Sequence, residues 1–199
     1  MRVGLKYVIV ACCVAALATT AGAQGKFKTT IDGTPPFTLG TALDTVLRGN
    51  PGFHPTSTPC PMEVETVNAV TTVNYETRLT APLAGYPYIA HVVLCFYQGK
   101  LAVIHLEWPS SGFRDSVLEW RSRAQELARQ LTSTYAADLL KRNFVDDDFG
   151  GRVEMRDGQG DVLTMIANGN VHGLNIVLDY VGAAYRQALV GPGSLEGSY

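Results

Sequence analysis

Two apolar segments on either side of a short glycine-containing loop constrain the fold more than any other feature of the sequence. Residues 88–97 and 101–108 each alternate between apolar and mixed positions, and the loop at 98–100 separates them. Alternation over this length is typical of two strands joined as an antiparallel hairpin. With a three-residue loop, His91 lies opposite Glu107, and a slip of one residue would move every side chain to the other face. The sequence therefore predicts a hairpin with one buried face.

The predicted register gives the hairpin two faces of different character. The first face is wholly apolar and consists of Tyr88, Ala90, Val92, Leu94, Phe96, Ala102, Ile104, Leu106 and Trp108. The second face is mixed and consists of His91, Val93, Cys95, Tyr97, Leu101, Val103, His105 and Glu107. We expect the apolar face to belong to the core and the mixed face to be partly covered or partly in contact with water.

The sequence before the hairpin predicts one short helix and one or two strands. Thr41 and Asp44 fit a capping box, with Thr41 as the N-cap of a helix that ends near Gly49. Residues 51–62 contain four prolines and are expected to form an irregular loop pinned at Cys60. The segment 63–79 is rich in valine and threonine, which favours strands.

The sequence after the hairpin predicts a long helix and then more strands. Apolar residues recur every three or four positions from Phe113 to Tyr135, which is typical of an amphipathic helix, and residues 138–144 are expected to add a further turn or two of helix. Strands are expected over 151–156, 162–167 and 171–181. They are separated by hairpin turns at Asp157-Gly158 and Asn168-Gly169. A terminal helix is expected over 182–190.

These elements predict an α+β fold in which an antiparallel sheet, built from meanders, packs against one long amphipathic helix. Residues 38–108 and 113–181 each hold a helix followed by strands, so a doubled helix-plus-strands unit is an open interpretation. We expect a single domain over 24–190 and a flexible tail over 191–199.

The N-terminal residues are typical of a secretory signal peptide over 1–23. Arg2 and Lys6 precede an apolar stretch, and Ala21-Gly22-Ala23 fits a cleavage site. An uncleaved membrane anchor and a lipoprotein modified at Cys12 are the alternatives. Cleavage would leave fourteen basic and eighteen acidic residues, a net charge of −4. This balance excludes the strong electrostatic attraction that nucleic acid or an anionic membrane requires, and no later segment is apolar enough to span a membrane.

The cysteine count agrees with export to the periplasm or beyond. Signal cleavage removes Cys12 and Cys13 and leaves Cys60 and Cys95. An even number of cysteines in an oxidising compartment predicts a disulfide between these two. The alternative is a pair of free thiols in a reducing compartment.

The main candidates for catalysis or metal binding lie on the mixed face of the hairpin. His91, His105 and Glu107 share that face in the predicted register, and two imidazoles with one carboxylate can hold zinc with an open position for water. The alternative is a partly solvated sheet face with a histidine–glutamate pair. Asp146-Asp147-Asp148 suits either a calcium loop or a solvated surface turn. Motifs for nucleotide binding or hydrolysis are missing from the sequence, and no cofactor is expected.

The segment Phe37 to Leu47 (FTLGTALDTVL) resembles the opening of small exported bacterial proteins of the outer-membrane-assembly BamE type. The doubled helix-plus-strands order is similar to that of β-lactamase-inhibitor proteins. These resemblances imply an exported binding protein without catalytic activity.

The sequence thus favours a non-enzymatic periplasmic or secreted protein that binds another protein or an envelope component. The expected working surface is the loop 51–62 together with the mixed face of the hairpin. Two alternatives stay open: an inhibitor or immunity protein against a hydrolase, and a metal-dependent hydrolase that uses His91, His105 and Glu107.

Overall fold

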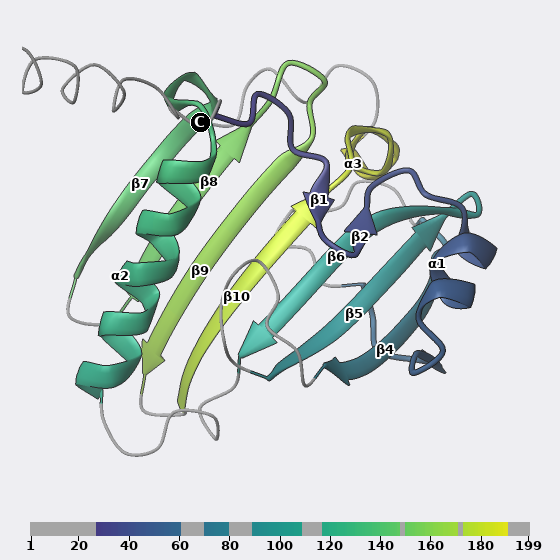
Figure 1. Ribbon diagram of the computed structural model, residues 1–199, viewed down its shortest axis with the longest axis horizontal. Coiled ribbons are helices and arrows are strands. Elements are labelled where there is room, and N and C mark those ends of the chain that lie inside the picture. Colours follow the sequence, from purple (N-terminus) through teal and green to yellow (C-terminus); the bar gives the residue numbers. More distant parts are fainter. Residues whose placement is uncertain are drawn as a thin grey trace, which may run out of the picture.

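An eight-stranded antiparallel sheet forms the centre of the computed structural model (Figure 1), which describes residues 27–60, 70–79, 89–108, 117–147, 150–170 and 173–190. For residues 142–147, 170 and 173 only the backbone is described. The strands are β3 (His54–Thr56), β4 (Val73–Leu79), β5 (Ala90–Tyr97), β6 (Lys100–Trp108), β7 (Leu140–Asp147), β8 (Gly150–Arg156), β9 (Val162–Asn170) and β10 (Gly173–Val181). Their order in the sheet is β3-β4-β5-β6-β10-β9-β8-β7. The predicted α+β class with an antiparallel sheet is therefore confirmed.

In the part of the chain that the structure describes, three α-helices and a small second sheet accompany the central sheet. The helices are α1 (Leu43–Gly49), α2 (Val117–Thr134) and α3 (Ala183–Val190), and the small sheet pairs β1 (Gly33–Thr34) with β2 (Phe37–Thr38). In chain order, α1 precedes strands β3 to β6, and α2 precedes strands β7 to β10. The last strands of these two groups, β6 and β10, pair with each other at the middle of the sheet.

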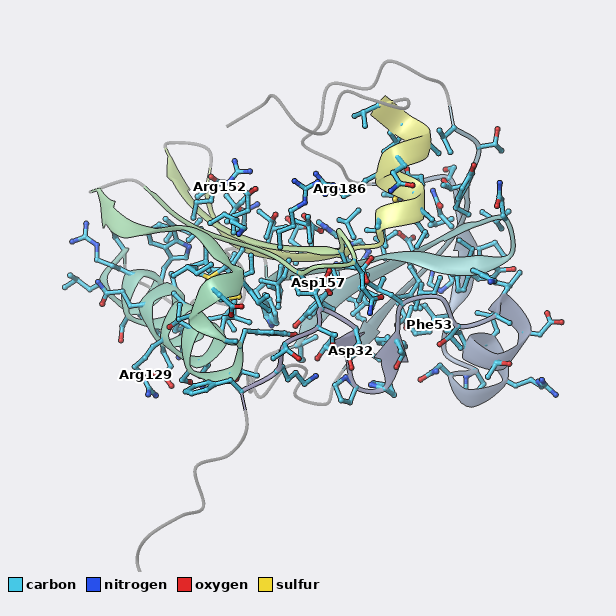
Figure 2. The ribbon with its side chains drawn as sticks, turned by 90° about the horizontal axis from the view of Figure 1, so that it is seen from above. Asp32, Phe53, Arg129, Arg152, Asp157 and Arg186 are labelled. Carbon is cyan, nitrogen blue, oxygen red and sulfur yellow. A yellow bond between two sulfur atoms is a disulfide. The ribbon has the colours of Figure 1, made fainter. Side chains whose placement is uncertain are left out.

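The two faces of the central sheet have different coverings. Figure 1 shows α2 in front of β8, between β7 and β9, and Figure 2 shows α1 and α2 on one side of the sheet and α3 on the other. We call the side of α1 and α2 the helix face, marked by Val92, Leu94, Ile104 and Leu106. We call the opposite side the α3 face, marked by Val93, Cys95, Val103 and Val181, which pack with Tyr185 and Leu189 of α3.

The hairpin of β5 and β6 has the predicted register over most of its length. His91 pairs with Glu107, as expected. Near the turn, however, Lys100 pairs with Tyr97, so the loop has two residues rather than the expected three. Both of these residues, Gln98 and Gly99, have positive φ angles, 52° and 74°. Such a turn matches the natural twist of paired strands, which explains why it replaces the longer loop.

The shorter turn exchanges the faces of two residues. A register shift lets Leu101 pair with Phe96 while Val103 pairs with Cys95, which leaves Ala102 between them. Leu101 thereby joins the core of the helix face and Ala102 joins the α3 face, the reverse of the prediction. The bulge places the larger apolar side chain in the larger core, which favours this arrangement.

The capping box predicted at Thr41 is wrong. Helix α1 begins at Leu43 with Ala42 as its N-cap, and no side chain caps it. The backbone N–H of Leu43 instead donates to the carbonyl oxygen of Gly99 (3.0 Å), and the N–H of Leu101 donates to the carbonyl of Thr41 (2.8 Å). Backbone hydrogen bonds with the hairpin turn thus satisfy the N-terminus of α1, for which the sequence predicts a side-chain cap.

The helical turns predicted over 138–144 are also wrong. A short 3-10 helix covers Ala137–Leu139, and the chain then enters β7, where Leu140 pairs with Met155 of β8. The edge of β8 offers a row of backbone hydrogen-bonding groups, so pairing with it overrides the local helical preference.

The turn predicted at Asn168-Gly169 lies inside strand β9. Gly169 pairs with Leu174 of β10, and the pairing continues to Asn170 opposite Gly173. A Cβ atom on Gly169 would lie 2.9 Å from the Trp120 ring, so this glycine makes room for a large side chain of α2. The glycine is explained by close packing rather than by a turn.

The main core lies on the helix face. Among its largest fully buried side chains are Phe37, Leu94, Ile104, Leu106, Trp108, Leu127, Met155 and Leu163. Helix α2 contributes Trp120, Ala124, Leu127, Ala128 and Leu131 to the same cluster. Among the described residues, no helix is both long enough and apolar enough to cross a membrane.

Several predictions concern residues that the structure does not describe. They are the signal peptide over 1–23, the strand start over 63–69, the hairpin residue Tyr88, the helix start at Phe113 and the tail over 191–199. The side chains of Asp146-Asp147-Asp148 also lie outside the described part.

Candidate functional site

The α3 face carries a band of polar side chains that runs across five neighbouring strands. Strand pairing places His54, Glu76, Val93, His105 and Asp179 in one row. Residues directly opposite on antiparallel strands are close enough to interact, as are diagonal neighbours when their side chains are long. We refer to His54, Glu76, His91, Glu107, His105 and Asp179 as the polar band.

Arg78, His91 and Glu107 form the adjacent row, two residues along each strand. His91 connects the two rows because its ring nitrogens face carboxylates on both sides. Its Nε2 atom lies 3.3 Å from Glu76 Oε2, and its Nδ1 atom lies 3.9 Å from Glu107 Oε2. The ring of His91 therefore lies between carboxylates of β4 and β6. A neutral imidazole donates from one nitrogen only, whereas a protonated ring can donate from both.

Glu76 is the most connected carboxylate of the band. Thr58 Oγ1 donates to Glu76 Oε2 (3.1 Å), and His54 Nε2 lies 3.6 Å from Glu76 Oε1. Partial desolvation raises the pKa of Glu76, but hydrogen bonds from Thr56, Thr58 and His91 together lower it below its ordinary value. Glu76 is thus held in its charged form on β4, next to the edge strand β3.

His105 takes a different partner from the one that the sequence suggested. Its Nδ1 atom lies 2.7 Å from Asp179 Oδ1, and both side chains are buried. The sequence predicted His105 beside His91 and Glu107, and the three do share a face. In the structure, however, His105 contacts a carboxylate of β10, whereas His91 contacts carboxylates of β4 and β6. Within the described ranges, no group of three or more histidine, cysteine, aspartate or glutamate residues is arranged to hold a metal ion.

Sequence reasoning missed Glu76, His54 and Asp179 as members of the polar band. The sequence predicts an irregular loop around His54, but residues 54–56 form the edge strand β3, where Pro55 is tolerated because one side of the strand needs no partner. Asp179 lies 74 residues beyond His105 in the chain. Only the pairing of β6 with β10 brings the two residues together, and no local sequence pattern predicts that pairing.

The predicted disulfide between Cys60 and Cys95 is confirmed, with Cα atoms 5.9 Å apart. Cys95 is fully buried on the α3 face, in the cluster that includes Val93, Val103 and Tyr185. The segment that follows β3 is therefore attached to the sheet at Cys95, while Thr58 fastens it to Glu76. The described part of the predicted loop, residues 51–60, thus lies beside the mixed hairpin face, with which the sequence predicts that it forms one working surface.

The turn over 157–161 is explained by backbone geometry. Asp157 Oδ1 accepts hydrogen bonds from the N–H groups of Gln159 (2.9 Å) and Asp161 (3.0 Å). Asp161 Oδ1 in turn accepts a hydrogen bond from the N–H of Ala183, the first residue of α3 (2.7 Å). Burial raises the pKa of Asp161, and the bond from Ala183 opposes this effect. These aspartates thus stabilise the turn and the start of α3.

Comparison with known proteins gives no match: no family model, no curated protein and no solved structure is similar enough to this chain to assign it to a family.

Proposed function

We propose that this chain is exported and acts, without catalysis, by binding another protein or an envelope component through its α3 face. The single observation that carries the proposal is the polar band, a set of histidines and carboxylates on the sheet that runs from the buried His105–Asp179 pair to partly exposed members nearer the edge. Glu76, His91 and Glu107 each keep between 24 and 32 % of their side-chain surface exposed. Polar groups of this kind can exchange water for a partner's hydrogen bonds at the rim of an interface.

The backing of the sheet supports the same proposal. We propose that α2, together with α1, packs the helix face of a doubled unit in which each helix is followed by four strands. The Nε1–H of Trp120 donates to the carbonyl oxygen of Asn175 (3.1 Å), and Asn175 Nδ2 donates to Glu107 Oε1 (3.4 Å). One residue thus connects the helix on one side to the polar band on the other. Such support holds a binding surface in place and lowers the entropy cost of binding.

Export is proposed on two independent grounds. The pattern of residues 1–23 is typical of a signal peptide. A disulfide between Cys60 and Cys95 is consistent with an oxidising compartment such as the periplasm. Intact-mass measurement of the protein from its native host tests this. We expect a chain that begins at Gln24 and resists alkylation unless it is first reduced. A chain that retains its leader, or that alkylates twice without reductant, would rule out the proposed location.

A pull-down from envelope extract, with chemical crosslinking, tests the binding surface. The variant Glu76→Gln/His91→Gln/Glu107→Gln removes the three ionisable groups of the polar band that are partly exposed and leaves the exposed His54 in place. The control, Glu126→Gln/Arg129→Gln, changes an exposed ion pair on α2. We expect parent and control to enrich the same partner and the band variant to lose it. Equal enrichment by all three proteins, or none by the parent, would contradict the proposal.

An inhibitor of a hydrolase is the second candidate. The observation that favours it is the segment 57–60, which the disulfide and Thr58 hold beside the sheet. A loop held rigid in this way can enter an active site with little loss of entropy. This candidate predicts a one-to-one complex with a single enzyme and loss of that enzyme's activity. A partner without hydrolytic activity would leave only the first proposal standing.

A further inference from the structure

The two edges of the central sheet differ in how well they are protected from pairing with another chain. One edge is β3, which has three residues including Pro55, and the other is β7, which has eight residues (Figure 1). Short length and proline are two means by which proteins prevent an edge strand from pairing. Strand β7 has neither, and in the described part of the chain no strand pairs with its outer side. The outer side of β7 can therefore accept a further strand.

The charges of β7 are separated along the strand. Lys141 and Arg142 lie near its start, and Asp146 and Asp147 lie at its end. The sequence suited either a calcium loop or a surface turn at these aspartates, whereas the backbone places both within the strand. Charges on an edge strand usually discourage pairing. Here their effect depends on which strand arrives and in which direction it runs, because the two signs occupy opposite ends.

A second copy of β7 that runs antiparallel would meet the first with opposite charges. Pairing centred on Phe144 places Lys141 opposite Asp147. It also places Arg142 opposite Asp146, and two-fold symmetry repeats both pairs. Opposite charges at directly opposite positions stabilise paired strands, and like charges destabilise them. Parallel pairing of two copies in register would instead set each charge beside its own sign. The charge pattern therefore favours a second copy in the antiparallel direction.

We propose that the outer edge of β7 pairs with the same edge of a second copy of this chain, antiparallel and centred on Phe144. The resulting dimer has one continuous sheet of sixteen strands, twice the eight of a single copy. A two-fold axis perpendicular to the sheet keeps each face on its own side, so both polar bands lie on the same side of the dimer. The inference goes beyond the proposed protein-binding function, because it uses none of the residues of the polar band. Either proposal can fail without affecting the other.

We expect a weak dimer whose affinity depends on salt. Register shifts interrupt the pairing of β7 with β8 on both sides of residues 142–144, so the regular part of the strand is short. Contacts smaller than a standard protein interface are typically transient, and salt screens ion pairs that are exposed to water. The dimer should therefore form at micromolar to millimolar protein concentration and dissociate further as salt is added.

Analytical ultracentrifugation of the purified protein and three charge variants tests the proposal. Lys141→Glu and Asp147→Lys each set like charges against each other in the proposed register. We expect each to raise the dissociation constant of the dimer at least tenfold. An equal mixture of these two variants, and the single chain Lys141→Glu/Asp147→Lys, bring opposite charges together again and should associate like the parent. Restored association also shows that the substitutions do not act by unfolding the chain.

Lys100→Glu is the matched control. It makes the same change of charge as Lys141→Glu on another exposed lysine, in β6, which three strands separate from β7. This control should dimerise like the parent. A parent that stays monomeric up to millimolar concentration at low salt would overturn the proposal. So would single variants that associate as strongly as the parent, or a mixture that stays monomeric.

Discussion

His105 and Asp179 form a buried pair across the middle of the sheet, with Nδ1 of the histidine 2.7 Å from Oδ1 of the aspartate. The two residues lie directly opposite each other on β6 and β10, the strands that join the two groups of four. A buried polar group that loses its partner costs free energy that a partnered one does not. This contact therefore couples the two halves of the sheet.

Replacing His105 by leucine should destabilise the protein, because Asp179 would stay buried without its partner. We expect a loss of about 1–3 kcal/mol in the free energy of unfolding, measured by urea denaturation at neutral pH. The double variant His105→Leu/Asp179→Leu should lose less than the sum of the two single variants. Strictly additive losses would show that the pair does not couple the strands. The exposed variant Glu126→Gln serves as control, with an expected change within about 0.5 kcal/mol.

Removing the disulfide should destabilise the fold strongly. Cys60 and Cys95 are 35 residues apart, and closing a loop of that length contributes roughly 3–4 kcal/mol in the chain-entropy model. We expect Cys60→Ala/Cys95→Ala to lower the unfolding free energy by that amount. A reductant should destabilise the parent and leave the double variant unchanged. An effect of reductant on the variant would point to damage elsewhere.

Gly169→Ala should be destabilising although alanine is the smallest possible addition. The new Cβ atom would lie 2.9 Å from the Trp120 ring, and overpacking of this kind costs about 1–3 kcal/mol. Gly158→Ala, where the Cβ atom meets nothing within 4 Å, is the matched control and should be nearly neutral. Thermal unfolding followed by circular dichroism compares the two. Equal melting temperatures would mean that α2 moves away from Gly169 at little cost.

Tyr135 should make the protein sensitive to alkaline pH. Burial, the largest cause, raises the pKa of Tyr135 from 10.0 to about 12, against the opposing effect of a hydrogen bond with Tyr180. The folded state favours the neutral phenol, so Tyr135 contributes to the free energy of unfolding. This contribution is fully present below the ordinary pKa and is lost as pH rises toward about 12.

Tyr135→Phe should therefore flatten the dependence of unfolding free energy on pH over that alkaline range. Urea denaturation at several alkaline pH values measures the slope, and ultraviolet difference absorbance between parent and variant reports the titration of the missing phenol. A phenol that titrates near its ordinary pKa, or a slope that the variant shares with the parent, would contradict this expectation.

The elements that could be predicted from the sequence are those fixed by neighbouring residues. The β5–β6 hairpin has its register because alternation over 88–108 leaves only one way to bury the apolar positions. The exchange of Leu101 and Ala102 could not be foreseen, because it depends on whether the turn holds two residues or three. Terminal helix α3 was placed correctly because its boundaries are marked by glycines at 182 and 191.

The candidate site was only half predictable, for a different reason. His91 and Glu107 belong to one hairpin, so their proximity followed from the register. Asp179 reaches His105 only through the pairing of β6 with β10, and Glu76 reaches His91 only through that of β4 with β5. Contacts between distant strands depend on the order of the whole sheet, which periodicity does not encode. The turn predicted at Gly169 is wrong for a similar reason. A glycine is required there by packing against a helix that lies about 50 residues away in the chain.

The pairing of the last strand with β6 has a consequence for how the chain reaches its final shape. Strand β6 is complete at Trp108, yet its second neighbour ends at Val181, close to the C-terminus. During synthesis, strands β3 to β6 have an unpaired edge at β6 until the rest of the chain has emerged. Such an edge invites pairing with other chains. Fragments that stop before Gly173 should therefore aggregate, and β10 and α3, with nine and eight residues, complete the sheet and its second face.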